Sequence, residues 1–163
     1  MDNFGQPADA PNTPSPENYK LKWHKFLIYF SLWAGAVMNV YSGIRSISGA
    51  QYGTDSAQVY AYYGGSLKAL DTAMGLVLLV LAVYTVYTRF QLAGFKIDAP
   101  RKLTVLYTAN LVASVLYLLA ASAVTKLPLS SFMSDMIGTI IGSIAMIFIN
   151  QNYYNKRMEL FVN

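Results

Sequence analysis

The chain has 163 residues, of which 55% are hydrophobic and only 12% are charged. Soluble domains carry about 25% charged residues, so this composition predicts a multi-pass membrane protein. The sequence contains no cysteine, which excludes disulfides, thiolate metal sites and thiol-based redox chemistry. The net charge of +4 does not indicate nucleic-acid binding, because the basic residues cluster at the ends of apolar segments, where they set membrane topology.

Residues 1–19 hold four of the six prolines, together with Asp, Asn, Ser and Thr. A segment with so few apolar residues cannot offset the entropy that ordering would cost. We therefore predict a disordered cytoplasmic tail over residues 1–19 and a single membrane domain over residues 20–163.

Long charge-free segments follow the tail, and the clearest runs from Thr72 to Thr88 between Lys68 and Arg89. An α-helix rises about 1.5 Å per residue, so about twenty residues cross a hydrocarbon layer of about 30 Å. The first such segment is longer than the apolar core of a signal peptide and lacks a small-residue cleavage site after it. We predict an all-α, four-helix transmembrane bundle with spans at about residues 26–44, 67–88, 103–125 and 135–154.

The distribution of Lys and Arg between the two ends of these spans predicts the orientation. Cytoplasmic loops are enriched in basic residues. One side would carry nine, namely Lys20, Lys22, Lys25, Arg89, Lys96, Arg101, Lys102, Lys156 and Arg157. The other side would carry three, namely Arg45, Lys68 and Lys126. We therefore predict a multi-pass protein of the bacterial inner membrane with both termini in the cytoplasm.

The loops between the spans differ in chemistry. Residues 45–65 are rich in glycine and tyrosine, and we expect the tyrosines to anchor this loop at the headgroups, with a ligand-binding role as the alternative. The basic loop 89–102 contains Phe90 and Phe95, which predicts a segment lying on the membrane surface and attracted to anionic headgroups. The one histidine, His24, precedes the first span and is expected to be interfacial.

Each predicted span carries a stripe of small or weakly polar residues, and such stripes mark the faces on which membrane helices meet. We expect them to pack helices within the chain; a homo-oligomer interface and a lined polar path are the alternatives. The candidate packing glycines are Gly35, Gly75, Gly138 and Gly142, of which the last two form a GxxxG. The stripes comprise Ser31, Gly35, Asn39 and Gly43; Asp71, Gly75 and Ala82; Asn110, Ser114, Tyr117 and Ala121; and Gly138, Thr139, Gly142 and Ser143.

Asp71 and Asp135 are the carboxylates nearest the predicted spans, and each precedes a glycine at the outer start of a helix. A carboxylate at a helix N-terminus is stabilised by unpaired backbone N–H groups, so capping is the first interpretation. The alternative is a solute or proton site, because ionisable residues in membrane helices are candidates for function. In that case Asn39 of the first span would join them in a shallow outer polar site, with Lys68 or Arg45 as a possible partner.

Several activities are excluded by the residue types present. A bis-histidine haem bundle needs two histidines, and His24 is alone. No Ser or Thr at membrane depth has a histidine to activate it as a nucleophile. We therefore predict no enzymatic activity, no cofactor and no metal site.

The stretches KWHKFLIYFSLWAGAVMN, TRFQLAGFK and NYYNKRMELFVN resemble a family of uncharacterised bacterial four-span integral membrane proteins. The resemblance covers residues 20–163, and because no activity is assigned to that family, it implies none here. We predict a non-enzymatic interaction or structural component of a membrane assembly, with a homo-oligomer or another membrane protein as partner. The alternative is a small transporter or channel with a polar site at the outer ends of the second and fourth spans.

Overall fold

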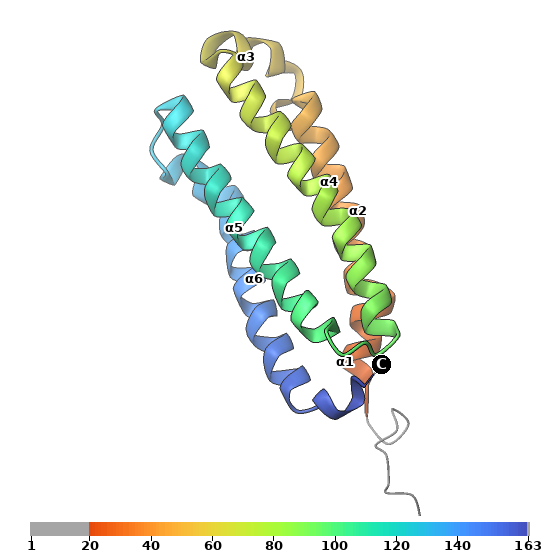
Figure 1. The fold of residues 1–163 in the computed structure, drawn as a ribbon. Coiled ribbons are helices and arrows are strands. Elements are labelled where there is room, and N and C mark those ends of the chain that lie inside the picture. Colours follow the sequence, from red (N-terminus) through yellow and green to blue (C-terminus); the bar gives the residue numbers. More distant parts are fainter. Residues whose placement is uncertain (1–19, 163) are drawn as a thin grey trace, which may run out of the picture.

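The computed structural model describes residues 20–162, apart from the side chains of residues 132–136. The predicted disordered tail, residues 1–19, lies outside the described residues. Helices are the only regular secondary structure in the described part, which confirms the all-α prediction (Figure 1). Three helical segments there are long and apolar enough to cross a membrane, namely Lys22–Tyr63, Gly65–Ala93 and Ala99–Thr125.

The first half of the chain forms a helical hairpin. Helix α1 (Lys22–Phe26) continues through a π-helical turn (Leu27–Ser31) into α2 (Leu32–Ser48). Gly49 ends α2 in the left-handed conformation, at φ 75°, and a Cβ at this position would approach the ring of Tyr60 to 2.7 Å. The 3₁₀ helix η3 (Ala50–Asp55) and the short helix α3 (Ser56–Tyr63) then turn the chain back into α4 (Gly65–Ala93).

The second half forms another hairpin. Helix α5 (Ala99–Thr125) has Pro100 in its first turn, where a missing backbone N–H costs nothing, so the proline starts this helix. Lys126 adopts the left-handed conformation after α5, and α6 (Ser130–Asn155) runs back beside it. Helices α5 and α6 therefore form a tight antiparallel hairpin. The short 3₁₀ helix η4 (Met158–Leu160) follows.

The helices pack in the order α2, α4, α5, α6, with α4 and α5 joining the two hairpins. No comparable packing joins α2 to α6 among the described residues. Within the first hairpin the contact is close, because a Cβ on Gly75 would lie 2.7 Å from the Gly43 carbonyl oxygen and 2.5 Å from Ile47 Cγ1. The hairpins approach each other where α1 begins and diverge towards α3 (Figure 1).

We call the converging end the basic end; it comprises α1, residues 94–98, the start of α5 and the C-terminal segment. We call the other end, with η3 and α3, the tyrosine end. The main apolar core of the described residues extends from the basic end into the adjacent halves of the long helices. It includes Leu21, Leu27, Ile28, Leu32, Leu81, Leu92, Ala99, Leu103, Leu106, Tyr154, Leu160 and Phe161.

His24 lies inside this core and is not exposed at the surface of the protein, while its predicted position at the level of the membrane interface stays a prediction. Its side chain is 2% exposed, its Nδ1 lies 3.0 Å from the Tyr154 hydroxyl, and its ring stacks on Phe95 at 4.8 Å between centroids. The ring of Phe161, in the C-terminal segment, meets the His24 ring edge to face at 6.2 Å between centroids. Phe95 also folds inward against the core, whereas Phe90 remains exposed, and contact of this loop with the membrane surface stays a prediction.

Candidate functional site

Asp71 lies in α4 at the tyrosine end and is fully buried, at 0% exposure. Its Oδ2 accepts hydrogen bonds from the hydroxyls of Tyr60 at 2.9 Å and Tyr52 at 3.1 Å. Its Oδ1 accepts one from Tyr117 at 2.7 Å. A hydrogen bond to a charged group contributes about 1.5–3 kcal/mol, so three phenol donors replace much of the hydration that the carboxylate loses. We call these four residues the tyrosine cage.

The donors of the cage come from three different elements. Tyr52 belongs to η3, Tyr60 to α3 and Tyr117 to α5. The rings of Tyr52 and Tyr60 meet edge to face at 5.6 Å between centroids, which holds both hydroxyls on the same carboxylate oxygen. Because Tyr117 belongs to the second hairpin and Asp71 to the first, the cage joins the two hairpins at the end where they diverge.

The electrostatics of the cage keep the loop tyrosines in their donor form. Burial and the neighbouring Asp71 carboxylate raise the pKa of the Tyr52 and Tyr60 phenols above the usual value. Both phenols therefore stay protonated at neutral pH. The recorded partners of Asp71 within the described part of the chain are these neutral hydroxyls, and none is cationic.

The structure changes the interpretation of the outer carboxylates. Helix α4 begins at Gly65, more than one turn before Asp71, so the capping role predicted for Asp71 is wrong. Neither predicted cationic partner bonds to Asp71. Arg45 donates to the Ala50 carbonyl at 3.2 Å, and Lys68 makes no hydrogen bond or ion pair with Asp71. The side chain of Asp135 lies outside the described residues, so its approach to Asp71 stays a prediction.

The tyrosine loop also differs from the sequence prediction. Its tyrosines were expected to anchor at the headgroups, and this is wrong for Tyr52 and Tyr60, which turn inward to Asp71. Tyr62 remains 83% exposed, as expected of an interfacial residue.

A cavity of about 520 Å³, lined by both polar and apolar side chains, lies beside the cage, between the two hairpins. Gln51 and Tyr117 line it on the cage side, where Gln51 Nε2 donates to the Tyr117 hydroxyl at 3.4 Å and Gln51 Oε1 accepts from Ser46 Oγ at 3.2 Å. The side chains come from α2, η3, α4, α5 and α6. They are Met38, Asn39, Ser42, Arg45, Ser46, Gln51, Met74, Leu78, Asn110, Ser114, Tyr117 and Thr139.

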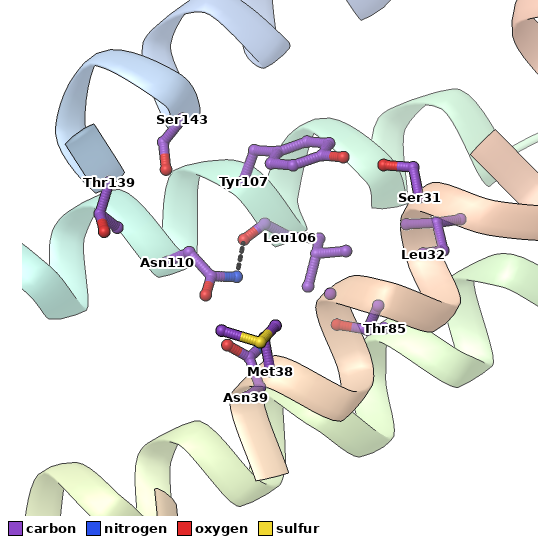
Figure 2. A pocket seen from close by; sticks show the side chains of 11 residues that line it. Ser31, Leu32, Met38, Asn39, Thr85, Leu106, Tyr107, Asn110, Thr139 and Ser143 are labelled. Atoms are coloured by element: carbon purple, nitrogen blue, oxygen red, sulfur yellow. Dashed lines mark hydrogen bonds between the residues drawn. The ribbon is translucent and has the colours of Figure 1, made fainter. Parts of the chain in front are cut away.

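A smaller space of about 170 Å³ adjoins this cavity towards the basic end and shares Met38, Asn39, Asn110 and Thr139 with it. Figure 2 shows its lining, with the Asn110 amide nitrogen donating to the Leu106 carbonyl oxygen at 2.9 Å. Polar side chains from all four long helices therefore surround one space at the depth of the apolar segments. The further residues of this lining are Ser31, Leu32, Gly35, Thr85, Tyr107 and Ser143.

The outer surface of the helices has the opposite chemistry. A groove of about 620 Å³ between α2 and α4 is lined by Trp33, Val37 and Val83 and other apolar or aromatic residues. Another, of about 420 Å³, lies between α4 and α5 and is lined by Val77, Leu116 and similar residues. The space between the hairpins thus carries polar side chains at the depth of the apolar segments, while these two outer grooves suit lipid chains.

The structure separates the four candidate packing glycines. Gly75 packs closely against α2. At Gly35, Gly138 and Gly142, by contrast, an added Cβ would find no described atom within 4 Å. These three glycines therefore do not form a close helix contact within the chain, and a contact with another molecule stays a prediction.

The residues of the predicted outer polar site do not all lie at one place in the structure. Asn39 lines the cavity, whereas Asp71 lies behind Tyr117 and does not line it. Sequence reasoning missed the role of Tyr52, Tyr60 and Gln51; the available signal was a tyrosine-rich loop next to an otherwise unpaired membrane carboxylate. It did identify the stripes containing Asn39, Asn110 and Thr139, which prove to face one cavity.

Among the described residues no group of three or more His, Cys, Asp or Glu could hold a metal ion. Comparison of the chain with protein-family models, curated proteins and solved structures finds no match.

Proposed function

We propose that this protein is a small transporter or channel that holds a polar solute in the cavity between its two hairpins. The observation that carries the proposal is the cavity lining, in which α2, α5 and α6 contribute Asn39, Asn110 and Thr139 at the depth of the apolar segments. A polar group exposed to hydrocarbon is unfavourable, so this space has to hold water or a solute.

The shape of the molecule supports the same function. Apolar packing joins the hairpins at the basic end, whereas polar hydrogen bonds through Tyr117 join them at the tyrosine end. Such an arrangement can widen at one end while the other stays packed. Access to the cavity would then be from the tyrosine end, past Tyr117 and Gln51.

We also propose that α6 spans the membrane with the other three segments and that the basic end faces the cytoplasm, in the inner membrane of a bacterium. The nine-to-three distribution of Lys and Arg supports this orientation. A reporter fused after Asn163 should be active only in the cytoplasm, and one inserted at Gly53 only outside. The opposite pattern would reverse the orientation.

The absence of native cysteine allows a direct test of the cavity. Thiols react as thiolates, which form in water but not in lipid. Asn110→Cys and Thr139→Cys in native membranes should therefore react with a water-soluble methanethiosulfonate reagent about tenfold faster than Val80→Cys. Val80 is the matched control, because its side chain is 68% exposed on the outer face of α4. Equally slow reaction at all three positions would overturn the transport proposal.

The second candidate is the interaction component predicted from the sequence, and the exposed glycines of α6 favour it. Gly138 and Gly142 lie on the surface of α6 with open space above them. Close backbone contact with another helix would cover this face. Replacing both by Leu should then abolish an oligomer seen by cross-linking in native membranes and leave the thermal stability of the purified protein unchanged. An unchanged cross-linking pattern would exclude this interface.

A further inference from the structure

Most of the free hydrogen-bonding side chains that line the cavity in the described part of the chain are uncharged. Asn39 makes no recorded hydrogen bond to another described residue, so its amide can both donate and accept. Asn110 uses its nitrogen on the Leu106 carbonyl, which leaves its Oδ1 free to accept (Figure 2). The hydroxyls of Ser42, Ser114 and Thr139 add further groups that donate or accept.

Among the described residues, the two charged side chains near the cavity already make hydrogen bonds. Three phenol hydroxyls saturate Asp71, and Tyr117 separates it from the cavity. Arg45 lines the rim, but its guanidinium donates to the Ala50 carbonyl at 3.2 Å and to the Tyr41 hydroxyl at 3.5 Å. It also lies over the Tyr41 ring at 5.5 Å from the centroid. Among the described side chains, a cation entering the cavity would find no free carboxylate, and an anion would meet only Arg45, at the rim.

From these contacts we propose that the cavity binds a small uncharged solute with several hydroxyl or amide groups, such as a polyol or a urea-like amide. The inference rests on the proposed function and names the class of its solute. Asn39 and Asn110 approach the space from opposite hairpins, so one solute can bond to both. A cavity of about 520 Å³ is within the usual range of about 300–1,000 Å³ for small-molecule sites.

Protection of a cysteine in the cavity tests this class directly. The full chain carrying Thr139→Cys, reconstituted in vesicles of phosphatidylethanolamine and phosphatidylglycerol, is treated with the methanethiosulfonate reagent. Xylitol, urea, choline chloride and sodium acetate are added in turn at equal millimolar concentration. We expect xylitol or urea to slow the reaction about threefold, because the solute would then occupy the cavity in most protein molecules. Choline and acetate should have no effect.

A second substitution identifies the residue that binds the solute. Asn39→Leu in the Thr139→Cys background should abolish the protection, whereas Val37→Leu, on the outer face of the same helix, should preserve it. Absence of protection by either neutral solute would overturn the inference, as would equal or stronger protection by choline or acetate. In each of these cases rapid labelling of Thr139→Cys would still support the proposed function. No labelling at all would overturn both.

Discussion

The basic end and the tyrosine end join the same two hairpins by different interactions. At the basic end, apolar side chains and stacked rings from four segments enclose His24, and Leu27, Leu92 and Leu103 are all 0% exposed. At the tyrosine end, the hairpins are joined through hydroxyl and amide groups around Asp71. A packed apolar core has few alternative arrangements, whereas a few hydrogen bonds can exchange for bonds to water.

The two ends of the molecule therefore differ in how tightly they hold the hairpins together. The packed core keeps the hairpins in register, while the polar contacts leave room for a cavity at the other end. The cage also explains how a carboxylate can be buried without a cation, since three donors satisfy it. Asp71 is therefore the residue whose hydrogen bond with Tyr117 joins the two hairpins at the tyrosine end.

The largest effect should follow from removing apolar volume at the basic end. Leu103→Ala empties a fully buried position of α5 and should lower the free energy of unfolding by about 2–5 kcal/mol. Leu116→Ala on the same helix removes the same atoms from a side chain that is 60% exposed, and should have a small effect. Detergent-denaturant titration of both variants measures the difference. Equal losses would show that the basic end holds no special core.

A smaller effect, confined to the other end, should follow from Tyr117→Phe. This change removes the hydroxyl that donates to Asp71 at 2.7 Å and should cost about 1.5–3 kcal/mol. It should also accelerate the labelling of Thr139→Cys, because it removes the bond that closes the tyrosine end. Tyr62→Phe is the control, since Tyr62 is exposed and makes no recorded hydrogen bond. Slower or unchanged labelling in the Tyr117 variant would contradict closure by the cage.

Two glycine substitutions test whether the first hairpin is rigid throughout. Gly75→Ala places a Cβ 2.5 Å from Ile47 Cγ1 and should cost about 1–3 kcal/mol through overpacking. Gly35→Ala meets no described atom within 4 Å and should be neutral or slightly stabilising, because alanine favours a helix. Thermal denaturation compares the two. If Gly75→Ala were also neutral, the packing of α2 against α4 at Gly75 would be loose.

The smallest effect concerns pH. His24 precedes the apolar segment 26–44, and burial lowers its pKa from 6.5 to about 4. The unfolded chain therefore takes up a proton at higher pH than the folded one, so stability is complete above about pH 6.5 and decreases as the pH falls towards 4. Between pH 7.5 and 5.5 we expect a loss on the order of 1 kcal/mol.

The control for this pH effect is His24→Phe, which removes the one histidine of the sequence. Its thermal stability should vary less with pH than that of the natural protein over the same interval. An equal slope in both would assign the pH dependence to another group.

Much of the fold follows from local properties of the sequence. The charge-free runs predict where long helices lie, because a helix satisfies its own backbone and about twenty residues reach across the membrane. The observed helices extend each predicted segment by a few residues, as in α4 (Gly65–Ala93) for residues 67–88. The spacing of Asn39, Asn110 and Thr139 likewise indicates polar faces, since helical periodicity is visible in the sequence.

What the tertiary structure alone decided is where those faces and the isolated ionisable groups point. Asp71 is caged by tyrosines 11, 19 and 46 positions away, and His24 is enclosed by a residue 130 positions away. No periodic pattern connects such positions, because the contacts depend on the turn at Gly49 and on the pairing of hairpins. The strongest packing signal in the sequence was the GxxxG of Gly138 and Gly142, yet Gly75 packs tightly while Gly138 faces open space, since only the relative placement of helices determines which stripe meets a neighbour.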